Sequence, residues 1–442
     1  MTISQIISFH PSLYFYRLIE TSLNTNMKCI QNLIIFSLLL FALTSCSYAA
    51  DRQKEISNYV SGKVIDEKNF PLPFVKVIIG SSEIQTDNNG KFKITDVKFP
   101  YDVVIVDRST ARAVIYKNLN EDSPDLIFFG KQSSRYSNSA VINVNFPEIS
   151  QGSSAIIKFI SSDVSYCRDI ELSSGEKTKT LLVEWPLNKK NITGNIIFLQ
   201  KNSTKFEQYS DKPITIFQSA NPFKITFSGN MNYNTRSSDI TIYLPFQDFK
   251  TKGYSVYADF LSYDRNSDIL LAKQEGNIQK TKSIIPSILP ISYRLKVSGF
   301  ADYNDGSGFV NYTYTQPGAT INLITENPPE LKTPSDKFLG TTGNTEFSFT
   351  SGSGTGVYVV HYHSFYPEME FYIVTAEKKS FLSYLSREEF KRASSIEFKW
   401  SVKKYLTYFS TDDFVKPKEF KNDVSYKAIL YSSERTFKTG YF

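Results

Sequence analysis

The sequence YVSGKVI at residues 59–65 indicates a β fold, because apolar and polar side chains alternate along it. Such alternation is typical of a β-strand that buries one face. Polar residues at 67–69 then predict a turn, and VKVII at 75–79 reads as the next strand. The sequence DNNG at 87–90 ends in an Asn-Gly pair, which supplies the positive φ of a tight hairpin. We therefore expect an all-β chain.

Three further blocks occur in order in this region: SGKVID at 61–66, PLPFVKV at 71–77 and TDNNGKF at 86–92. Together they resemble the carboxypeptidase regulatory-like domain, which has transthyretin-like topology. The resemblance covers 59–130 and implies a seven-stranded β-sandwich that serves exported proteins as a non-catalytic accessory module. Phe74 stands where this family usually has a glycine. No zinc peptidase domain or receptor plug follows, so the resemblance predicts architecture and location more than activity.

Short strands continue after a polar, turn-rich stretch at 133–139, which we interpret as a domain boundary. A second boundary is expected at 284–290, because prolines at that density interrupt ladder pairing. Helical spacing of apolar residues predicts at most one short helix, near 380–392. The chain should thus form tandem β-sandwich domains, with the first sandwich at 59–130, a sandwich of unknown type at 140–283 and a β-rich domain at 292–442.

Length and composition agree with several folded domains. The chain has 442 residues, which corresponds to about three domains of typical size. Aromatic residues make up 15% and charged residues 21%, so the chain carries too much apolar material to be disordered. The net charge of +6 is spread over 50 basic and 44 acidic residues, without a long block of one sign. The sequence therefore predicts no nucleic-acid partner.

The N-terminus predicts export. An apolar run at 32–43 follows Lys28 and has the length of a signal-peptide core, which is too short to span a bilayer comfortably. Met27 precedes this run and is an alternative start to Met1. Residues 1–45 would then hold an upstream extension and the signal peptide, and 46–58 a polar linker.

The segment Leu43-Thr44-Ser45-Cys46 resembles the bacterial lipobox, in which small residues precede a cysteine that is diacylated. The resemblance implies a lipoprotein that is held on a membrane through the lipid on Cys46. The alternative is cleavage by the ordinary signal peptidase after Ala49 or Ala50, because the residues before them also fit the small-x-small rule. That alternative predicts a periplasmic or secreted protein.

Cysteine usage fits an exported protein without disulfides. Cys29 lies in the signal region and Cys46 is the expected lipidation site, which leaves Cys167 alone in the mature chain. We expect Cys167 to be a small buried hydrophobe.

His361 and His363 are the first candidates for chemistry. Two positions apart on a predicted strand, they share a face and could hold a metal ion with a third ligand from a neighbouring strand. Val357 and Val359 share that face, however, so the pattern is more typical of a strand that leaves a core and enters solvent. We therefore predict no metal site and no cofactor.

Two loops resemble known ligand-binding loops, one for calcium and one for phosphate. The sequence DYNDGSG at 302–308 carries oxygen donors like a calcium loop, but Gly306 and Thr313 stand where an EF-hand needs ligands, so we predict a hairpin turn. The sequence GSGTG at 352–356 lacks the lysine and the following helix of a phosphate loop, so we predict a flexible connection.

The sequence contains no G-x-S-x-G, H-E-x-x-H or C-x-x-C motif. It favours a non-enzymatic surface lipoprotein of the bacterial envelope, a binding or structural array whose partners would be extracellular carbohydrate or protein. The alternative is a secreted or anchored hydrolase that acts on polysaccharide through two carboxylates, which need no local motif. A cleft with converging carboxylates would favour the hydrolase, and an exposed aromatic or loop surface would favour the binding protein.

Overall fold

The computed structural model is nearly all β, which confirms the predicted fold class. Its α-helix within the described residues is α2 (Thr411–Val415). The helix predicted at 380–392 is wrong for 380–381, which belong to strand β27 (Lys379–Phe381), and its remainder from 384 lies outside the described residues. No helix in the described part is long and apolar enough to cross a bilayer. The structure describes residues 59–67, 70–107, 109–130, 137–162, 167–187, 189–202, 206–228, 235–244, 250–259, 268–276, 280–288, 294–323, 326–383, 395–416 and 426–440.

The described residues of the first module, 59–130, form seven strands, as the resemblance implied. One sheet has the order β4-β1-β7, and these strands pack against a second run in the order β3-β2-β5-β6. Val64 and Phe92 from the first sheet are buried with Val77 and Ile105 from the second. The strands are β1 (Tyr59–Ile65), β2 (Lys76–Ile79), β3 (Ser82–Gln85), β4 (Lys91–Thr95), β5 (Tyr101–Asp107), β6 (Arg112–Leu119) and β7 (Asp125–Ile127).

The Asn-Gly turn reverses the chain without forming the expected two-stranded hairpin. Gly90 has φ +72°, as predicted, and a Cβ there would lie 2.5 Å from the carbonyl oxygen of Val64. However, β3 pairs with β2 and β4 pairs with β1, so the turn carries the chain from one sheet to the other. The hairpin prediction was wrong because a turn signal does not specify which strands pair.

The strands from 137 to 323 surround two further cores. The sheets β10-β9-β12-β13 and β11-β8-β14 bury Phe159, Trp185 and Phe198. The sheet β18-β15-β21 packs with β16 and β19, and Ile242 and Val256 are buried there. The strands are β8 (Ser137–Asn145), β9 (Ser154–Ser161), β10 (Cys167–Leu172), β11 (Thr178–Pro186), β12 (Asn191–Lys201), β13 (Phe206–Phe217), β14 (Phe223–Thr226), β15 (Thr235–Tyr243), β16 (Thr251–Asp259), β17 (Asp268–Glu275), β18 (Lys280–Ile288), β19 (Arg294–Asp302), β20 (Gly308–Thr315) and β21 (Thr320–Asn322).

Ladders cross the stretch at 284–290 where a boundary was expected. Strand β18 continues through Pro286, which pairs with Ser237 of β15. Within its described sheet β18 is an edge strand, where a residue without an N–H is tolerated. In addition, β16 pairs with β19, so strands on either side of this stretch share one sheet.

The last strands extend the sheet of the first module. Its order continues β20-β29-β28-β25-β26-β6-β5-β2-β3, and β30 pairs with both β28 and β23. A separate sheet, β22-β24-β27, packs against it. The strands are β22 (Glu330–Thr333), β23 (Phe338–Thr341), β24 (Glu346–Thr350), β25 (Val357–Phe365), β26 (Glu368–Thr375), β28 (Glu397–Tyr405), β29 (Tyr426–Tyr431) and β30 (Arg435–Thr439).

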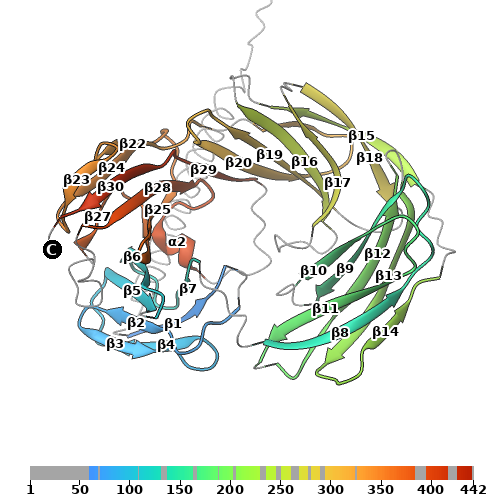
Figure 1. The fold of residues 1–442 in the computed structure, drawn as a ribbon, viewed down its shortest axis with the longest axis horizontal. Coiled ribbons are helices and arrows are strands. Elements are labelled where there is room, and N and C mark those ends of the chain that lie inside the picture. Colours follow the sequence, from blue (N-terminus) through green and yellow to red (C-terminus); the bar gives the residue numbers. More distant parts are fainter. Residues whose placement is uncertain are drawn as a thin grey trace, which may run out of the picture. The chain divides into compact units, whose positions relative to one another are not determined.

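Strands β6 and β26 are the link between the first module and these last strands. They run parallel, from Arg112 beside Glu370 to Tyr116 beside Val374, and Figure 1 shows β6 next to the C-terminal strands and α2. Side chains alternate across a strand, so the shared sheet has two buried faces. One face contributes Tyr116 and Val374 to the core with β1, β4 and β7, and the other contributes Ile115 to the core with β24.

Candidate functional site

The sheet gathers polar side chains at the point where β6 meets β26. The parallel ladder places Arg112 beside Glu370. The antiparallel hairpin of β25 and β26 places His363 opposite Glu370. It also places His361 opposite Tyr372. Because residues paired across a ladder project from the same face, these five side chains form one group, which we call the junction cluster.

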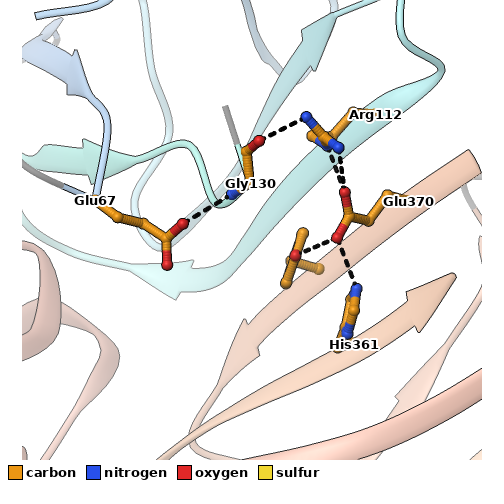
Figure 2. Close-up of polar contacts among 6 residues, drawn as sticks. Glu67, Arg112, Gly130, His361 and Glu370 are labelled. Atoms are coloured by element: carbon orange, nitrogen blue, oxygen red, sulfur yellow. Dashed lines mark hydrogen bonds and ion pairs between the residues drawn. The ribbon is translucent and has the colours of Figure 1, made fainter. Parts of the chain in front are cut away.

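Arg112 and Glu370 form the ion pair at the centre of the junction cluster (Figure 2). The Arg112 Nε donates to Glu370 Oε2 at 2.6 Å, and Nη2 contacts the same oxygen. The Arg112 Nη1 donates to the carbonyl of Gly130 at 2.8 Å, and the Gly130 N–H donates to Glu67 Oε2 at 3.1 Å. The two charged side chains are only 15% and 18% exposed, so solvent screens this pair less than a surface pair.

Gly130 brings the backbone up to this ion pair. Its φ is +72°, a conformation that favours glycine. A Cβ at this position would lie 3.1 Å from Glu370 Oε2 and 3.2 Å from Arg112 Cζ. A side chain at residue 130 would therefore be strained by the backbone and crowded by the ion pair.

Glu370 is an ionised acceptor that several donors share. Its Oε1 accepts a hydrogen bond from the Tyr372 hydroxyl and lies 3.0 Å from His361 Nε2. Burial is the largest influence and would raise the pKa of Glu370, but the hydrogen bonds from His361 and Tyr372 and the charge of Arg112 outweigh it and lower the pKa to about 2. A carboxylate can only accept, so His361 carries a proton on Nε2. Burial, and then Glu370, raise the pKa of Tyr372, which keeps its hydroxyl a donor.

A row of rings runs along the same sheet face. The ring of Tyr372 lies 5.1 Å from that of Phe129 and stacks on His361 at 4.3 Å. His361 stacks on His363 at 5.0 Å, and His363 meets Phe365 edge-on at 5.1 Å. Phe129 is 6% exposed and Phe365 is 64% exposed, so the row leads from the core to the surface.

His363 has the least favourable surroundings in this row. Its Nδ1 is buried and has no hydrogen-bond partner in the described part of the chain. Burial, followed by the neighbouring His361, lowers the pKa of His363. The ring is therefore neutral at neutral pH.

Chemically, the junction cluster joins two distant segments. Arg112 and Glu370 are 258 residues apart in sequence, and their hydrogen bonds tie the first module to the last strands. Among the residues that the structure describes, no group of three or more histidines, cysteines, aspartates or glutamates is placed to hold a metal ion. The arrangement suits cohesion between strands.

The two histidines lie on one face of β25, as the sequence indicated. Val357 and Val359 of the same face are buried, and both imidazoles are only partly exposed. Of the other candidate residues, Cys167 begins β10. The lipobox residues Leu43, Thr44, Ser45 and Cys46 lie outside the described residues.

The stretch at 302–308 is a hairpin turn, which confirms that prediction. Strands β19 and β20 pair down to Asp302 opposite Gly308. The Asp305 carboxylate accepts from the Ser307 N–H at 3.0 Å and the Ser307 hydroxyl at 2.7 Å. Asp302 accepts from the Tyr431 hydroxyl. Both carboxylates therefore stabilise the turn and its neighbouring strand.

The glycine-rich stretch at 352–356 encloses a lysine. The Lys404 side chain is 0% exposed, and its Nζ contacts Glu326 and donates to the Gly354 carbonyl at 2.7 Å. The Gly354 N–H in turn donates to Glu326 Oε2 at 3.1 Å. The stretch that we predicted to be a flexible connection is thus fastened around a buried ion pair.

A hollow of about 630 Å³ lies at one end of the first module, beside the β2–β3 turn and the loop before β5. Asp96 and Asp102 both line it. Asp102 is paired with Lys117 and accepts from the Asn118 N–H at 3.0 Å. These contacts of Asp102 hold β5 beside β6 and give this carboxylate a structural role.

Sequence reasoning missed Arg112, Glu370 and Tyr372. The last two could have been found, because Tyr366-Pro367 separates two alternating runs and a hairpin there places them opposite the two histidines. No local pattern near Arg112 indicates its partner, since pairing over 258 residues leaves no periodic signal.

No protein-family model matches the chain, and no curated protein matches it. Among solved structures, the chain is similar to a candidate adhesin from Bacteroides ovatus, with 8% identity, a TM-score of 0.17 and coverage of 42% of this chain and 89% of that chain. A tetra-tandem repeat in the extending region of a large adhesion protein gives 8% identity, a TM-score of 0.17 and coverage of 87% and 100%. The Bacillus anthracis TIE protein gives 9% identity, a TM-score of 0.15 and coverage of 61% and 50%. Scores this low carry no argument about function.

Proposed function

We propose that the protein is a non-enzymatic lipoprotein that is exported and anchored on the bacterial envelope, where it presents β-sandwiches as a binding or structural array. The observation that carries this proposal is the position of Cys46, directly after Leu43-Thr44-Ser45 and an apolar run at 32–43. The all-β architecture of the described residues supports it, because sandwiches joined by continuous ladders form a stiff support for a binding surface.

Within this proposal, 59–130 is a carboxypeptidase regulatory-like accessory module. Two observations support it. The module has seven strands in two packed sheets among its described residues. Phe74, at the position of the usual glycine, has φ +58°, so the turn keeps the left-handed conformation that glycine favours.

The partners that we propose are the membrane, through the lipid on Cys46, and an extracellular carbohydrate or protein. The tip of the β25–β26 hairpin supports a binding role, because Phe365 is 64% and Tyr366 is 92% exposed. Aromatic side chains are enriched where proteins contact partners.

The test is membrane fractionation and intact mass of the full chain expressed in a bacterium, with Cys46→Ala compared with Cys167→Ala. We expect wild type and Cys167→Ala in the membrane fraction, with the mass of a diacylated N-terminal cysteine. We expect Cys46→Ala to lose both. Cys167→Ala is the matched control, because it removes a thiol that lies in strand β10 and not in the lipobox.

The opposite result would also be decisive. If wild type and Cys46→Ala are both released into the soluble fraction and begin near Ala50 or Asp51, the ordinary signal peptidase cleaves the chain and the anchor proposal fails.

A further inference from the structure

His363 lies in a row of charged side chains that crosses four strands. Ladder pairs place Arg112 beside Glu370, Glu370 opposite His363, and His363 opposite Lys399. Lys399 in turn forms an ion pair with Glu434, whose Oε2 lies 3.5 Å from the Lys399 Nζ. The strands on both sides of the hairpin, β6 and β28, thus carry a cation in the row of His363.

The acceptors near His363 are already occupied. Glu370 accepts from three donors of the junction cluster, and Glu434 pairs with Lys399. The buried Nδ1 of His363 has no partner within the described residues. A proton on that nitrogen would create a buried N–H without an acceptor, which is costly.

We propose that His363 is an acid-sensitive latch of the β25–β26 hairpin: when it takes up a proton, its ring leaves the stack beside His361 and the hairpin loosens next to β6. The inference rests on the geometry of the junction cluster and is independent of the lipoprotein proposal.

Four groups on the surrounding strands influence whether His363 takes up a proton. His361 and Lys399 disfavour a charge on His363, whereas Glu434 and Glu370 favour it. Burial, the largest influence, and the repulsion from His361 prevail, so the pKa of His363 is lowered. Rotation of the ring into solvent relieves both the burial and the repulsion, at the cost of its stack on His361 and its edge contact with Phe365.

The direction of the pH effect follows. The ordinary pKa of histidine is 6.5, and the latched state has a lower one, so the opened state binds the proton more readily. The stability that neutral His363 contributes is complete above about pH 6.5, the ordinary pKa of histidine, and is lost as the pH falls below it. Acidification should therefore favour the open hairpin.

The test is hydrogen exchange of the full chain by mass spectrometry at about pH 7.5 and about pH 5.5, corrected for the chemical exchange rate. In wild type we expect the corrected protection of β25 and β26 to be lower at about pH 5.5 than at about pH 7.5, because the opened hairpin binds the proton more readily than the latched one. Strands β12 and β13 serve as the internal reference, because they belong to another sheet. His363→Phe keeps a ring in the stack but cannot titrate, so it should abolish the fall.

Two results would overturn the latch. One is equal corrected protection of β25 and β26 at both pH values in wild type. The other is a fall in His363→Phe as large as in wild type. Should His363→Phe not fold, His363→Gln provides the same comparison, because its side chain is likewise uncharged over this range.

Discussion

Phe74 adopts a backbone conformation that usually belongs to glycine. Its φ is +58°, and its N–H donates to the Thr86 carbonyl at 3.0 Å. The next N–H, of Val75, donates to the Thr86 hydroxyl at 2.9 Å, so Thr86 holds the turn through both its backbone and its side chain. A left-handed conformation costs an L-residue about 1–2 kcal/mol, and the surrounding turn must offset this strain.

We therefore predict that Phe74→Gly is more stable than Phe74→Ala by about 1 kcal/mol. Both variants lose the ring, which is 55% exposed, and only alanine retains the steric penalty at positive φ. Urea denaturation, followed by hydrogen exchange in β2 and β5, measures the difference. Equal stability of the two variants would mean that the turn relaxes when the ring is removed.

Glu370 links stability to pH at the junction cluster. Its pKa is about 2 in the folded chain against an ordinary value of 4.5, so the carboxylate stabilises the fold above about pH 4.5 and loses this effect as the pH falls towards 2. The shift corresponds to at most about 3 kcal/mol. We predict that wild type loses more stability over this range than Glu370→Gln, which cannot titrate. At neutral pH the variant should be less stable by about 1–3 kcal/mol, since Arg112 loses its counter-charge.

Glu330→Gln is the matched control for that titration. Glu330 also pairs with a cation, Lys332, but its side chain is 70% exposed. The hydrogen bond from Lys332 lowers the pKa of Glu330 as well, but solvent screens this exposed pair. Acid denaturation monitored at β6 and β26 should therefore stay close to the wild-type curve in Glu330→Gln and be flatter in Glu370→Gln. Identical curves for the two variants would exclude Glu370 as the titrating group.

At the scale of elements, strand positions were predictable because they follow from local alternation. The strand predicted at 59–65 coincides with β1, and the strand predicted to carry His361 and His363 is β25. Strand pairing was less predictable, because a turn or a proline marks the end of a strand without specifying which strand it pairs with. The chain thus passes between sheets at Gly90 and pairs through Pro286, against expectation in both cases.

Helix α2 had no periodic signal in the sequence. It has 5 residues, fewer than a hydrophobic period needs to be visible. Ser410 caps it, since its hydroxyl accepts from the Asp413 N–H at 3.1 Å. Phe414 and Val415 are buried in the core of the first module, so packing stabilises the helix more than its own hydrogen bonds do.

Asp412 fastens α2 to the loop between β6 and β7. Its Oδ1 accepts from the N–H of Asn120 at 2.6 Å and of Glu121 at 3.1 Å. We predict that Asp412→Ala costs about 1–2 kcal/mol and raises hydrogen exchange at 119–123, because two backbone donors lose their acceptor. Asp413→Ala is the control, since Asp413 lies in the same turn but accepts from Phe409. An equal rise at 119–123 in both variants would show that Asp412 does not hold the loop.

At the scale of the molecule, the first module depends on residues from the other end of the chain. On one sheet face, Val359 and Phe414 complete its core. On the other face, Ile115 packs in a core with Phe347 and Tyr362. Local patterns indicated a sandwich at 59–130 but not these partners, because long-range pairing depends on the complementarity of whole faces.

A fragment of 59–130 should therefore not fold as a stable monomer. Alone, it would expose the apolar side chains of the second face, Ile78, Val104, Val106, Ala113 and Ile115. Burial of each large aliphatic side chain contributes about 1.5–3 kcal/mol, so the combined loss is comparable to the stability of a small domain. Amide NMR spectra of the fragment should show poor dispersion, and a chain of 59–442 should restore protection in β6. A well-dispersed spectrum of the fragment, with β6 protected, would instead make the module autonomous and the β6–β26 ladder a contact between two independently stable sandwiches.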